Sequence, residues 1–383
     1  MIINRLIAKN WRNFREIDVQ LSERQFIVGA NASGKSNLLD IFRFLRDVVK
    51  SEGGGFQKAV KDRGGLSKIR NLAARKDPEV KIEVHLAEDA DATSAWRYSL
   101  GFRQEPRGYR HTYLTHERVW KNGSELLNRP TSDDDVDRER LTQTFLEQIN
   151  VNAGFREIAR FLQTVTYQHL VPQLLRYADS IQGKIVEDDP FGQGFLEKIA
   201  SITEKTRRSR LKAIEEALKI AVPQLKQLGF IRDDITGRPH LQALYSHWRP
   251  RGAWQREDQF SDGTLRLLGL LWTLLESESI LLLEEPELSL NAGIVSQLAP
   301  LISKMQRRRQ RQVFVSTHSV ALLADQGIDG REVLLLKPAN EGTTVELASD
   351  IADVKPLLEA GLTVADAVLS RTKPDHPEQL SLL

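Results

Sequence analysis

Apolar residues at the start of the chain follow the patterns of short strands that lead into a helix. Their spacing predicts one strand beginning at Ile2 and a second over residues 17–21. A third apolar run, residues 25–28, passes directly into a glycine-rich turn. Apolar positions three and four apart then predict a helix from Ser36 to Lys50. The chain therefore begins with strands followed by a strand–turn–helix unit.

The pattern changes twice along the middle of the chain. Alternating positions from Val80 to about Gly123 predict antiparallel strands, with Asn122-Gly123 as a hairpin turn. Residues from about 138 to 228 favour helices, and a short strand over 164–167 interrupts them. No heptad repeat is long enough to form a coiled-coil arm. We therefore expect an antiparallel β subdomain followed by a mainly helical lobe.

From Phe260 onward, helical patterns alternate with fully apolar strands. The expected elements are helices over about 264–276 and 292–308 and strands over 280–283, 313–316, 332–336 and 343–347. Buried parallel strands flanked by helices have this appearance. The C-terminal third therefore reads as part of an α/β fold.

Composition and charge narrow the class of protein. The 383 residues contain 40% hydrophobic and 28% charged residues and no cysteine, which excludes disulfides and thiolate metal sites and fits a cytoplasmic protein. No uncharged apolar stretch of about 18 residues predicts a membrane span, and the histidines lack a zinc-type spacing. The net charge of +2 alone does not indicate nucleic acid. Two basic runs, around Arg207–Lys212 and Arg307–Arg311, could meet phosphates or be solvated helix faces.

The strongest motif is a complete GxxxxGK[ST] sequence between the strand over 25–28 and the predicted helix. Its residues are Gly29, Ala30, Asn31, Ala32, Ser33, Gly34, Lys35 and Ser36, followed by Asn37. Such a loop curls around phosphates, and its backbone N–H groups and the helix N-terminus bind the anion. Lys35 is expected to reach the β- and γ-phosphates, and the Ser36 hydroxyl is expected to bind Mg²⁺.

A second motif, residues 280–287, joins an apolar strand to a group of carboxylates. The sequence Ile-Leu-Leu-Leu-Glu-Glu-Pro-Glu places Glu284 and Glu285 at the strand's C-terminal end, where open α/β sheets bind ligands. We expect Glu284 to hold Mg²⁺ through water and Glu285 to polarise the attacking water. Two shorter motifs also lie at the ends of predicted helices or strands. Ser-Asp-Gly-Thr, 261–264, precedes a helix, and Ser-Thr-His-Ser, 316–319, ends a buried strand and places His318 beside the expected phosphate site.

The order of these four motifs resembles the RecF/SMC/ABC-type head ATPases and is most similar to the ATPases grouped as AAA-21 or AAA-15. Asn13-Phe14-Arg15, between two strands, matches a further motif of that group. The resemblance covers about the first 50 residues and residues 255 to 350. It implies an α/β fold, a P-loop NTPase of ABC-ATPase head type with an antiparallel β subdomain and an inserted helical lobe, and it implies ATP and Mg²⁺ as cofactors.

Further residue roles follow from the resemblance alone. Ser261 and Gly263 would form a signature loop that contacts the γ-phosphate of ATP held by a second protomer, and residues 288–291 would cross that interface. His318 would sense the γ-phosphate. Arg12 and Phe14 lie where such heads contact the base, and Gln168 is the candidate Q-loop ligand of the metal.

Four parts are expected along the chain. They are residues 1–130, the first half of the head with its β subdomain; 131–255, a mainly helical lobe; 256–370, the second half of the head; and 371–383, a flexible tail. Within the tail, Thr372-Lys373-Pro374-Asp375 has the letters of a guanine-binding motif but follows no apolar strand, so ATP is favoured. The last five residues, 379–383, resemble a short peptide that binds the bacterial DNA sliding clamp.

The departures from the family pattern limit the function. Ser-Asp-Gly-Thr and Glu-Glu replace the transporter motifs, and no coiled-coil arm separates Lys35 from Ser261. We expect a homodimer, open to higher assembly, that closes on ATP and acts in DNA repair or DNA sensing. Alternatively, the head belongs to an anti-phage or toxin-like system and controls a separate TOPRIM-type nuclease. A third alternative is a scaffold that binds ATP without hydrolysing it.

Overall fold

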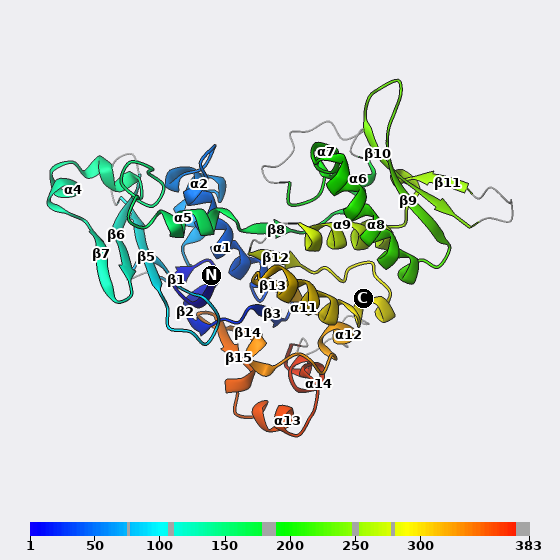
Figure 1. The fold of residues 1–383 in the computed structure, drawn as a ribbon. Helices are drawn as coiled ribbons and strands as arrows, with labels where there is room; N and C mark the ends of the chain where they lie inside the picture. Colours follow the sequence, from blue (N-terminus) through cyan, green and yellow to red (C-terminus); the bar gives the residue numbers. More distant parts are fainter. Residues whose placement is uncertain (75–76, 106–110, 178–188, 247–252, 277–279, 373–383) are drawn as a thin grey trace, which may run out of the picture. The chain divides into compact units, whose positions relative to one another are not determined.

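The computed structural model describes residues 1–74, 77–105, 111–177, 189–246, 253–276 and 280–372. The chain forms two compact units, and each unit is built from two or more separate segments of the chain (Figure 1). Unit 1 comprises Met1–Thr166, Glu278–Leu282 and Arg309–Leu383, and unit 2 comprises Tyr167–Ser277 and Leu283–Arg308. This division cuts across the four expected parts, since residues 131–166 group with the N-terminal half. The sliding-clamp peptide of the tail lies outside the described residues.

A six-stranded sheet carries the loop of the first motif. Its strands, in sheet order, are β15 (Gly342–Leu347), β14 (Val333–Ala339), β3 (Arg24–Gly29), β13 (Val313–Thr317), β12 (Leu281–Glu284) and β8 (Thr166–Gln168). The central strand β3 pairs in parallel with β13 and β14, and β15 is antiparallel to β14. The strands predicted over 25–28, 280–283, 313–316, 332–336 and 343–347 are therefore confirmed.

A second, antiparallel sheet forms the β subdomain of unit 1. Its order is β2 (Phe14–Gln20), β1 (Ile2–Trp11), β4 (Val80–Ala87), β5 (Trp96–Gln104), β6 (Thr112–Lys121) and β7 (Ser124–Arg129). The predicted hairpin turn joins β6 to β7, with φ of 47° at Asn122 and 81° at Gly123. Inside the subdomain, the buried Arg129 guanidinium pairs with Glu117 at 3.0 Å and Asp134 at 2.9 Å, so these three buried charges compensate one another.

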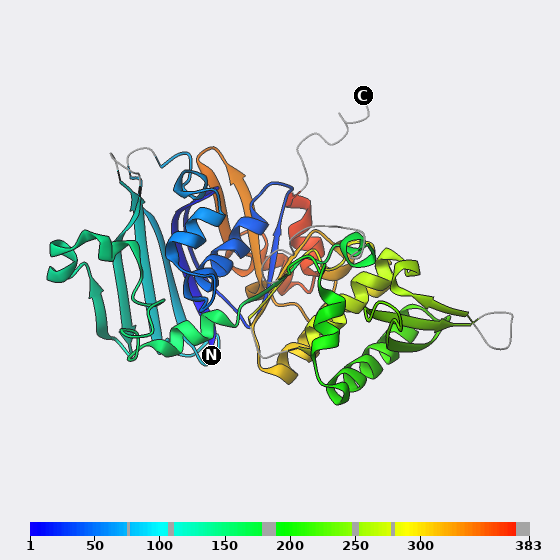
Figure 2. The ribbon, with the colours of Figure 1, turned by 90° about the horizontal axis from the view of Figure 1, so that it is seen from above.

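Helix α1 (Lys35–Val49) packs between these two sheets (Figure 2). Its Phe42 ring lies 4.6 Å from that of Phe314 in β13, and its Phe44 ring stacks at 5.5 Å on Phe102 in β5. Neighbouring positions of one helix thus bury aromatic rings against both sheets, which fixes the position of the helix N-terminus. The other short helices of unit 1 are α2 (Phe56–Asp62), α3 (Leu66–Ile69), α4 (Ser132–Val136), α5 (Arg156–Gln163), α12 (Val320–Leu323), α13 (Lys355–Glu359) and α14 (Val364–Val368).

Unit 2 has its own core of helices and strands. Its helices are α6 (Pro172–Arg176), α7 (Phe195–Ser201), α8 (Glu204–Ala221), α9 (Asp262–Leu275), α10 (Ala292–Val295) and α11 (Leu298–Arg309). Trp272 of α9, Ile214 of α8 and Leu241 of a neighbouring strand belong to one buried cluster. No helix in the described ranges is both long and apolar enough to cross a membrane.

Two features of unit 2 differ from the sequence-based expectation. The lobe contains a three-stranded antiparallel sheet, in the order β11 (Ala253–Arg256), β10 (Pro239–Tyr245) and β9 (Leu225–Arg232), because cross-strand pairing outweighs the helix-like spacing of Leu225 and Leu228. The helix predicted over 292–308 is divided into α10 and α11. Pro300 lacks an N–H group and its ring would clash with the carbonyl of residue 296, so a new helix begins at Leu298.

Candidate functional site

The loop between β3 and α1 is shaped for close approach of its backbone to a ligand. Ala32 and Gly34 both have positive φ, at 62° and 101°. A Cβ atom on Gly29 would lie 2.5 Å from Ser33 Oγ and 2.8 Å from the carbonyl oxygen of Leu336 in β14, so only glycine fits there. Left-handed residues within a short loop turn successive N–H groups toward one concavity, which is the geometry of an anion-binding nest.

Lys35 and His318 meet at this loop. The Lys35 ammonium donates hydrogen bonds to the carbonyl oxygens of Gly29, at 3.0 Å, and Ala30, at 3.2 Å. Its Nζ also lies 3.4 Å from Nδ1 of His318. Because β3 and β13 pair in parallel with Val28 opposite Thr317, their C-terminal ends lie side by side and bring these two residues together. The structure thus joins two motifs that are far apart in the sequence.

One buried polar atom of the loop fits a bound phosphate. The Ser33 side chain is fully buried, and its Oγ has no hydrogen-bond partner among the residues that the structure describes. Leaving a buried hydroxyl unsatisfied costs about 1–3 kcal/mol. A phosphate oxygen in the loop would supply the missing acceptor. Asn31 and Ser36 are exposed at the same loop, where a nucleotide and its metal ion can reach them.

Asn13 holds the loop in place from the turn between β1 and β2. Its Nδ2 donates to the carbonyl oxygen of Ser33 and to Thr343 Oγ1, both at 2.8 Å. Its Oδ1 accepts from Asn37 Nδ2 at 2.7 Å. A side chain on Gly34 would collide with Asn13 at 2.1 Å. From the sequence, Arg12 and Phe14 of this turn are expected to contact the base. In the structure, Asn13 between them supports the loop directly through hydrogen bonds.

A cavity of about 550 Å³ lies beside the N-terminus of α1, within unit 1. Arg12, Asn13 and Asn37 line it together with residues 67–68, 70–73 and 340–342. Its size suits a base and sugar, and the last two segments had no recognisable signal in the sequence. Phe14 is fully buried and absent from this lining, so its ring offers no surface to a base. The expected base contact at Phe14 is therefore withdrawn, and Arg12 is retained.

Arg12 is held within a charged cluster next to this cavity. Its Nη2 lies 2.6 Å from Asp40 Oδ2, and Arg63 lies 3.0 Å from the other oxygen of that carboxylate. Burial alone would raise the pKa of Asp40, but Arg63 and Arg12 outweigh it and lower that pKa below its ordinary value. The carboxylate therefore stays charged and fixes the position of Arg12.

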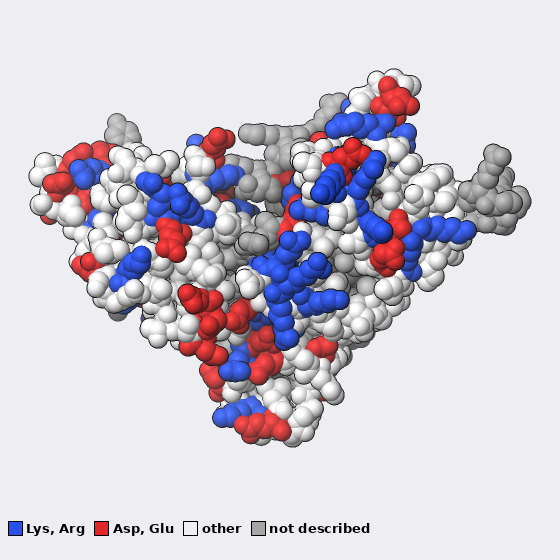
Figure 3. Space-filling view, in the orientation of Figure 1, with Lys and Arg blue, Asp and Glu red and all other residues white. Residues whose placement is uncertain are grey.

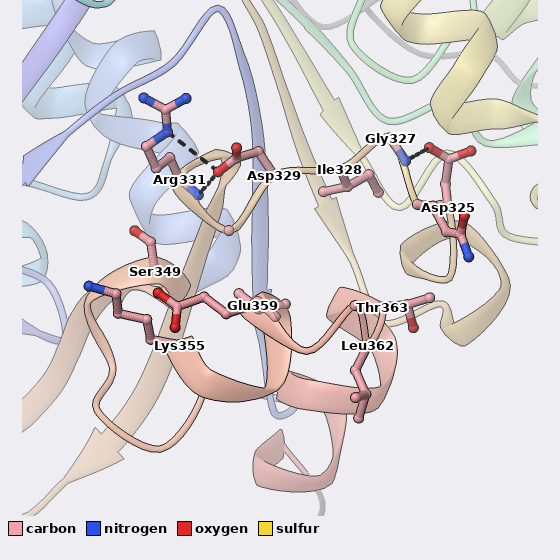
Figure 4. A pocket seen from close by; sticks show the side chains of 14 residues that line it. Asp325, Gly327, Ile328, Asp329, Arg331, Ser349, Lys355, Glu359, Leu362 and Thr363 are labelled. Carbon is pink, nitrogen blue, oxygen red and sulfur yellow. Dashed lines mark hydrogen bonds and ion pairs between the residues drawn. The ribbon is translucent and has the colours of Figure 1, made fainter.

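A larger cavity, of about 740 Å³, lies away from the motifs (Figure 4). The loop of residues 325–331 forms one side, and residues of α13 and of the turn before α14 form the other. Its charged side chains have both signs, with Arg331 beside Asp329 at 3.4 Å and Lys355 and Glu359 on the facing side. It contains no residue of the four motifs, so size alone does not mark the functional site.

In unit 2, Glu284 ends β12 and Glu285 follows it directly. The Tyr167 hydroxyl donates to Glu284 Oε2, and His169 Nδ1 lies 3.2 Å from the Glu284 carbonyl oxygen. Glu285 has a φ of 43°, a strained value for a residue other than glycine. Such strain persists where a fold needs a side chain in one particular direction. Gln168 ends β8 and is half-buried. No sequence signal marked Tyr167.

The Ser-Asp-Gly-Thr segment forms the start of α9. Ser261 is exposed and caps the helix by accepting from the Thr264 N–H at 3.1 Å. A Cβ on Gly263 would lie 2.6 Å from the carbonyl oxygen of Ser289, so the 288–291 loop packs directly on this turn. Arg176 of α6 donates to Asp262 at 2.5 Å and to the Phe260 carbonyl oxygen at 2.6 Å. Arg176 was not identified from the sequence.

No ready-made metal site accompanies these residues. Across the described ranges, no group of three or more His, Asp or Glu side chains could hold a metal ion. Mg²⁺ usually keeps several waters and binds through one or two protein ligands and the phosphates of a substrate. Ser36 of unit 1 carries a hydroxyl oxygen and Glu284 of unit 2 carries a carboxylate, and both are oxygen ligands of the kind that Mg²⁺ prefers.

Comparison with known proteins agrees with this geometry. The model of a family described as "AAA domain, putative AbiEii toxin, Type IV TA system" matches residues 26–324. Among solved structures, the chain is similar to "the SmcHead bound to the C-winged helix domain of ScpA", with 16% identity, a TM-score of 0.53, and coverage of 90% of this chain and 98% of that one. The chain has the fold of an ABC/SMC-type P-loop ATPase head, as expected from the sequence.

Two further solved structures match with lower TM-scores. A Smc head domain with an extended coiled coil, from Pyrococcus furiosus, shares 14% identity, a TM-score of 0.48, and coverage of 90% of this chain and 95% of that one. The SMC head domain from Thermotoga maritima shares 14% identity, a TM-score of 0.45, and coverage of 91% and 99%. No curated protein matches the chain.

Proposed function

Because the chain belongs to the AAA-domain family whose model spans residues 26–324, we propose that it binds and hydrolyses ATP as a dimerising switch. The observation that carries this proposal is the geometry of the loop from Gly29 to Ser36. Lys35 lies in this loop, with its ammonium 3.4 Å from His318. The buried Ser33 hydroxyl has no hydrogen-bond partner among the described residues, and a phosphate oxygen could accept from it. The fold alone would not establish it, since one fold supports many functions.

Each residue has a defined task in the proposed reaction. Lys35 binds the β- and γ-phosphates, and His318 contacts the γ-phosphate beside it. Ser36 and Glu284 hold Mg²⁺, which when bound neutralises negative charge on the phosphate oxygens. Glu285 orients and polarises the attacking water. Arg12 contacts the base from the 550 Å³ cavity.

Two copies of the chain would complete two such sites. Ser261 and Gly263 of one protomer would contact the γ-phosphate bound by the other, and residues 288–291 would line the contact between them. The exposure of Ser261 and the packing of Ser289 on Gly263 support this arrangement, because both segments form one surface of unit 2. ATP would shift the population toward the closed dimer, and hydrolysis would release it.

Turnover by the full chain tests the proposal directly. With Mg²⁺ we expect phosphate release from ATP that EDTA abolishes, because the reaction depends on a metal ion at Ser36 and Glu284. GTP serves as the comparison nucleotide, and we expect ATP to be the better substrate. Absence of phosphate release above buffer, from a folded chain that binds ATP, would favour the non-hydrolysing scaffold instead.

We further propose DNA as the partner that this switch serves, because one surface of unit 2 is strongly basic. Figure 3 shows a dense group of Lys and Arg side chains over α11. Residues 288–324 include no Asp or Glu, and Lys304, Arg307 and Arg308 are exposed on α11. Within the described part of the chain, these three have no carboxylate partner. Unpaired cations of this kind bind phosphate backbones.

Removing these three cations should weaken DNA binding. For Lys304→Ala combined with Arg307→Ala and Arg308→Ala, we expect the slope of log K against log salt on a duplex to fall by about 2–3. Fluorescence anisotropy with a labelled 30-base-pair duplex measures it. The matched control removes three exposed cations elsewhere, Arg138, Lys226 and Lys355, and should keep the slope. Equal slopes in both triple variants would contradict α11 as the DNA surface.

A second candidate role is supported by the family description, which names a toxin of a type IV toxin–antitoxin system. In that role the ATPase head would control a separate nuclease instead of acting in repair. Co-purification of a nuclease encoded beside this chain would favour it. Stimulation of ATP turnover by DNA alone would favour repair or sensing.

A further inference from the structure

Glu284 is restrained by two side chains at the C-terminal end of β8, Tyr167 within the strand and His169 just after it. Tyr167 is buried, and its hydroxyl donates to Glu284 Oε2. The His169 imidazole lies against the carbonyl oxygen of the same glutamate, at 3.2 Å. All three residues belong to unit 2. The side chain and the backbone of Glu284 are therefore each held by a different neighbour.

Strand geometry separates Gln168 from Tyr167. Successive side chains along a strand point to opposite faces, so Tyr167 and Gln168 lie on opposite faces of β8. Since Tyr167 reaches the Glu284 carboxylate from its face, the Gln168 amide is directed away from it. Of these two neighbouring residues, Tyr167 and not Gln168 is therefore the one that contacts the Glu284 carboxylate.

A glutamate at position 284 needs such a restraint more than an aspartate would. Glutamate has one more rotatable bond, and ordering it costs more conformational entropy when a metal binds. A hydrogen bond that already fixes one carboxylate oxygen removes part of that cost. Groups that orient a metal ligand typically change metal affinity by about 10- to 100-fold.

We propose that Tyr167 is a positioning residue for the metal carboxylate: by donating to Glu284 Oε2, it orients this side chain for Mg²⁺. This inference rests on the proposed function, because it requires that Glu284 bind the cation of Mg-ATP. Tyr167 itself touches neither the nucleotide nor the metal in this account. Its effect reaches the metal through Glu284 alone.

The test is metal affinity in the presence of a non-hydrolysable ATP analogue. Mn²⁺ serves as the probe, and its binding to the full chain is followed by electron paramagnetic resonance. For Tyr167→Phe, which removes the hydroxyl and keeps the ring, we expect the Mn²⁺ midpoint to rise by about 10- to 100-fold. Binding of the analogue without metal should stay unchanged.

Two controls separate positioning from general destabilisation. Tyr98→Phe removes another buried hydroxyl that donates to a carboxylate, Glu117, at 3.3 Å in unit 1, and should leave the midpoint unchanged. In a Glu284→Gln background, Tyr167→Phe should add no further effect, because the group it acts through is altered.

The outcomes distinguish this inference from the function on which it rests. A Tyr167→Phe midpoint within about twofold of the unmodified chain would overturn the inference alone. So would a shift that persists in full in the Glu284→Gln background. If the unmodified chain binds neither the analogue nor Mn²⁺, the proposed function fails, and the role of Tyr167 fails with it.

Discussion

Replacing Glu285 by glutamine is expected to reduce ATP turnover by about 10²- to 10³-fold while ATP affinity changes little. The amide keeps the size of the side chain but no longer polarises water, so binding and hydrolysis should separate. The φ of 43° at Glu285 shows that the backbone is held in a costly conformation, which fixes where this carboxylate projects. Single-turnover phosphate release and equilibrium ATP binding measure the two effects.

The matched control for this variant is Glu216→Gln, which neutralises an exposed carboxylate of α8 in the same unit. It should leave both turnover and binding at the level of the unmodified chain. Loss of ATP binding in Glu285→Gln, with the fold intact, would show that Glu285 supports the ground state. Turnover equal to that of the unmodified chain would remove Glu285 from the reaction.

Substituting arginine for Ser261 should reduce the rate of ATP turnover by about 10²-fold or more. Binding of ATP to the single chain should be retained. Ser261 is exposed at the start of α9 and is proposed to contact the ATP of a second copy. A long charged side chain at this point would separate the two protomers. The result is measured as turnover at increasing protein concentration, because a dimer-dependent rate rises with concentration.

The substitution also removes a helix cap, whose loss costs about 0.5–2 kcal/mol. Thr203→Arg supplies the control, since Thr203 is an exposed cap of α8 that accepts from the Thr206 N–H at 3.4 Å. If Thr203→Arg reduces turnover as strongly as Ser261→Arg, capping accounts for the effect and the role of Ser261 across a dimer is lost.

The sequence predicted the nucleotide loop well because its signal is local. Gly29, Gly34 and Lys35 lie within one segment of seven residues, and the flanking apolar strand and helix are visible as patterns. The loop itself depends on few residues, all of which lie close together along the chain. The position of His318 beside this loop was predicted from the buried strand that precedes it, whereas the parallel pairing of β3 with β13, which brings His318 to Lys35, is a finding of the structure.

Other features depended on contacts between distant segments and could not be predicted. Tyr167 reaches Glu284 across 117 positions, and Arg176 reaches Asp262 across 86. The β9–β11 sheet depends on strand pairing that a helix-like spacing concealed. Phe14 was expected to contact the base because it belongs to the Asn13-Phe14-Arg15 motif. It begins β2 with its ring in the core and is therefore buried.

ATP-dependent dimerisation is tested most directly by the light-scattering mass of Glu285→Gln with Mg²⁺, measured without and then with ATP. We expect ATP to raise the mass from one chain to two, or to tighten an existing dimer, and we expect the added Ser261→Arg substitution to abolish the change. ATP binding with no change in mass, in both variants alike, would contradict the ATP-sandwich mechanism and leave a constitutive ATP-bound scaffold.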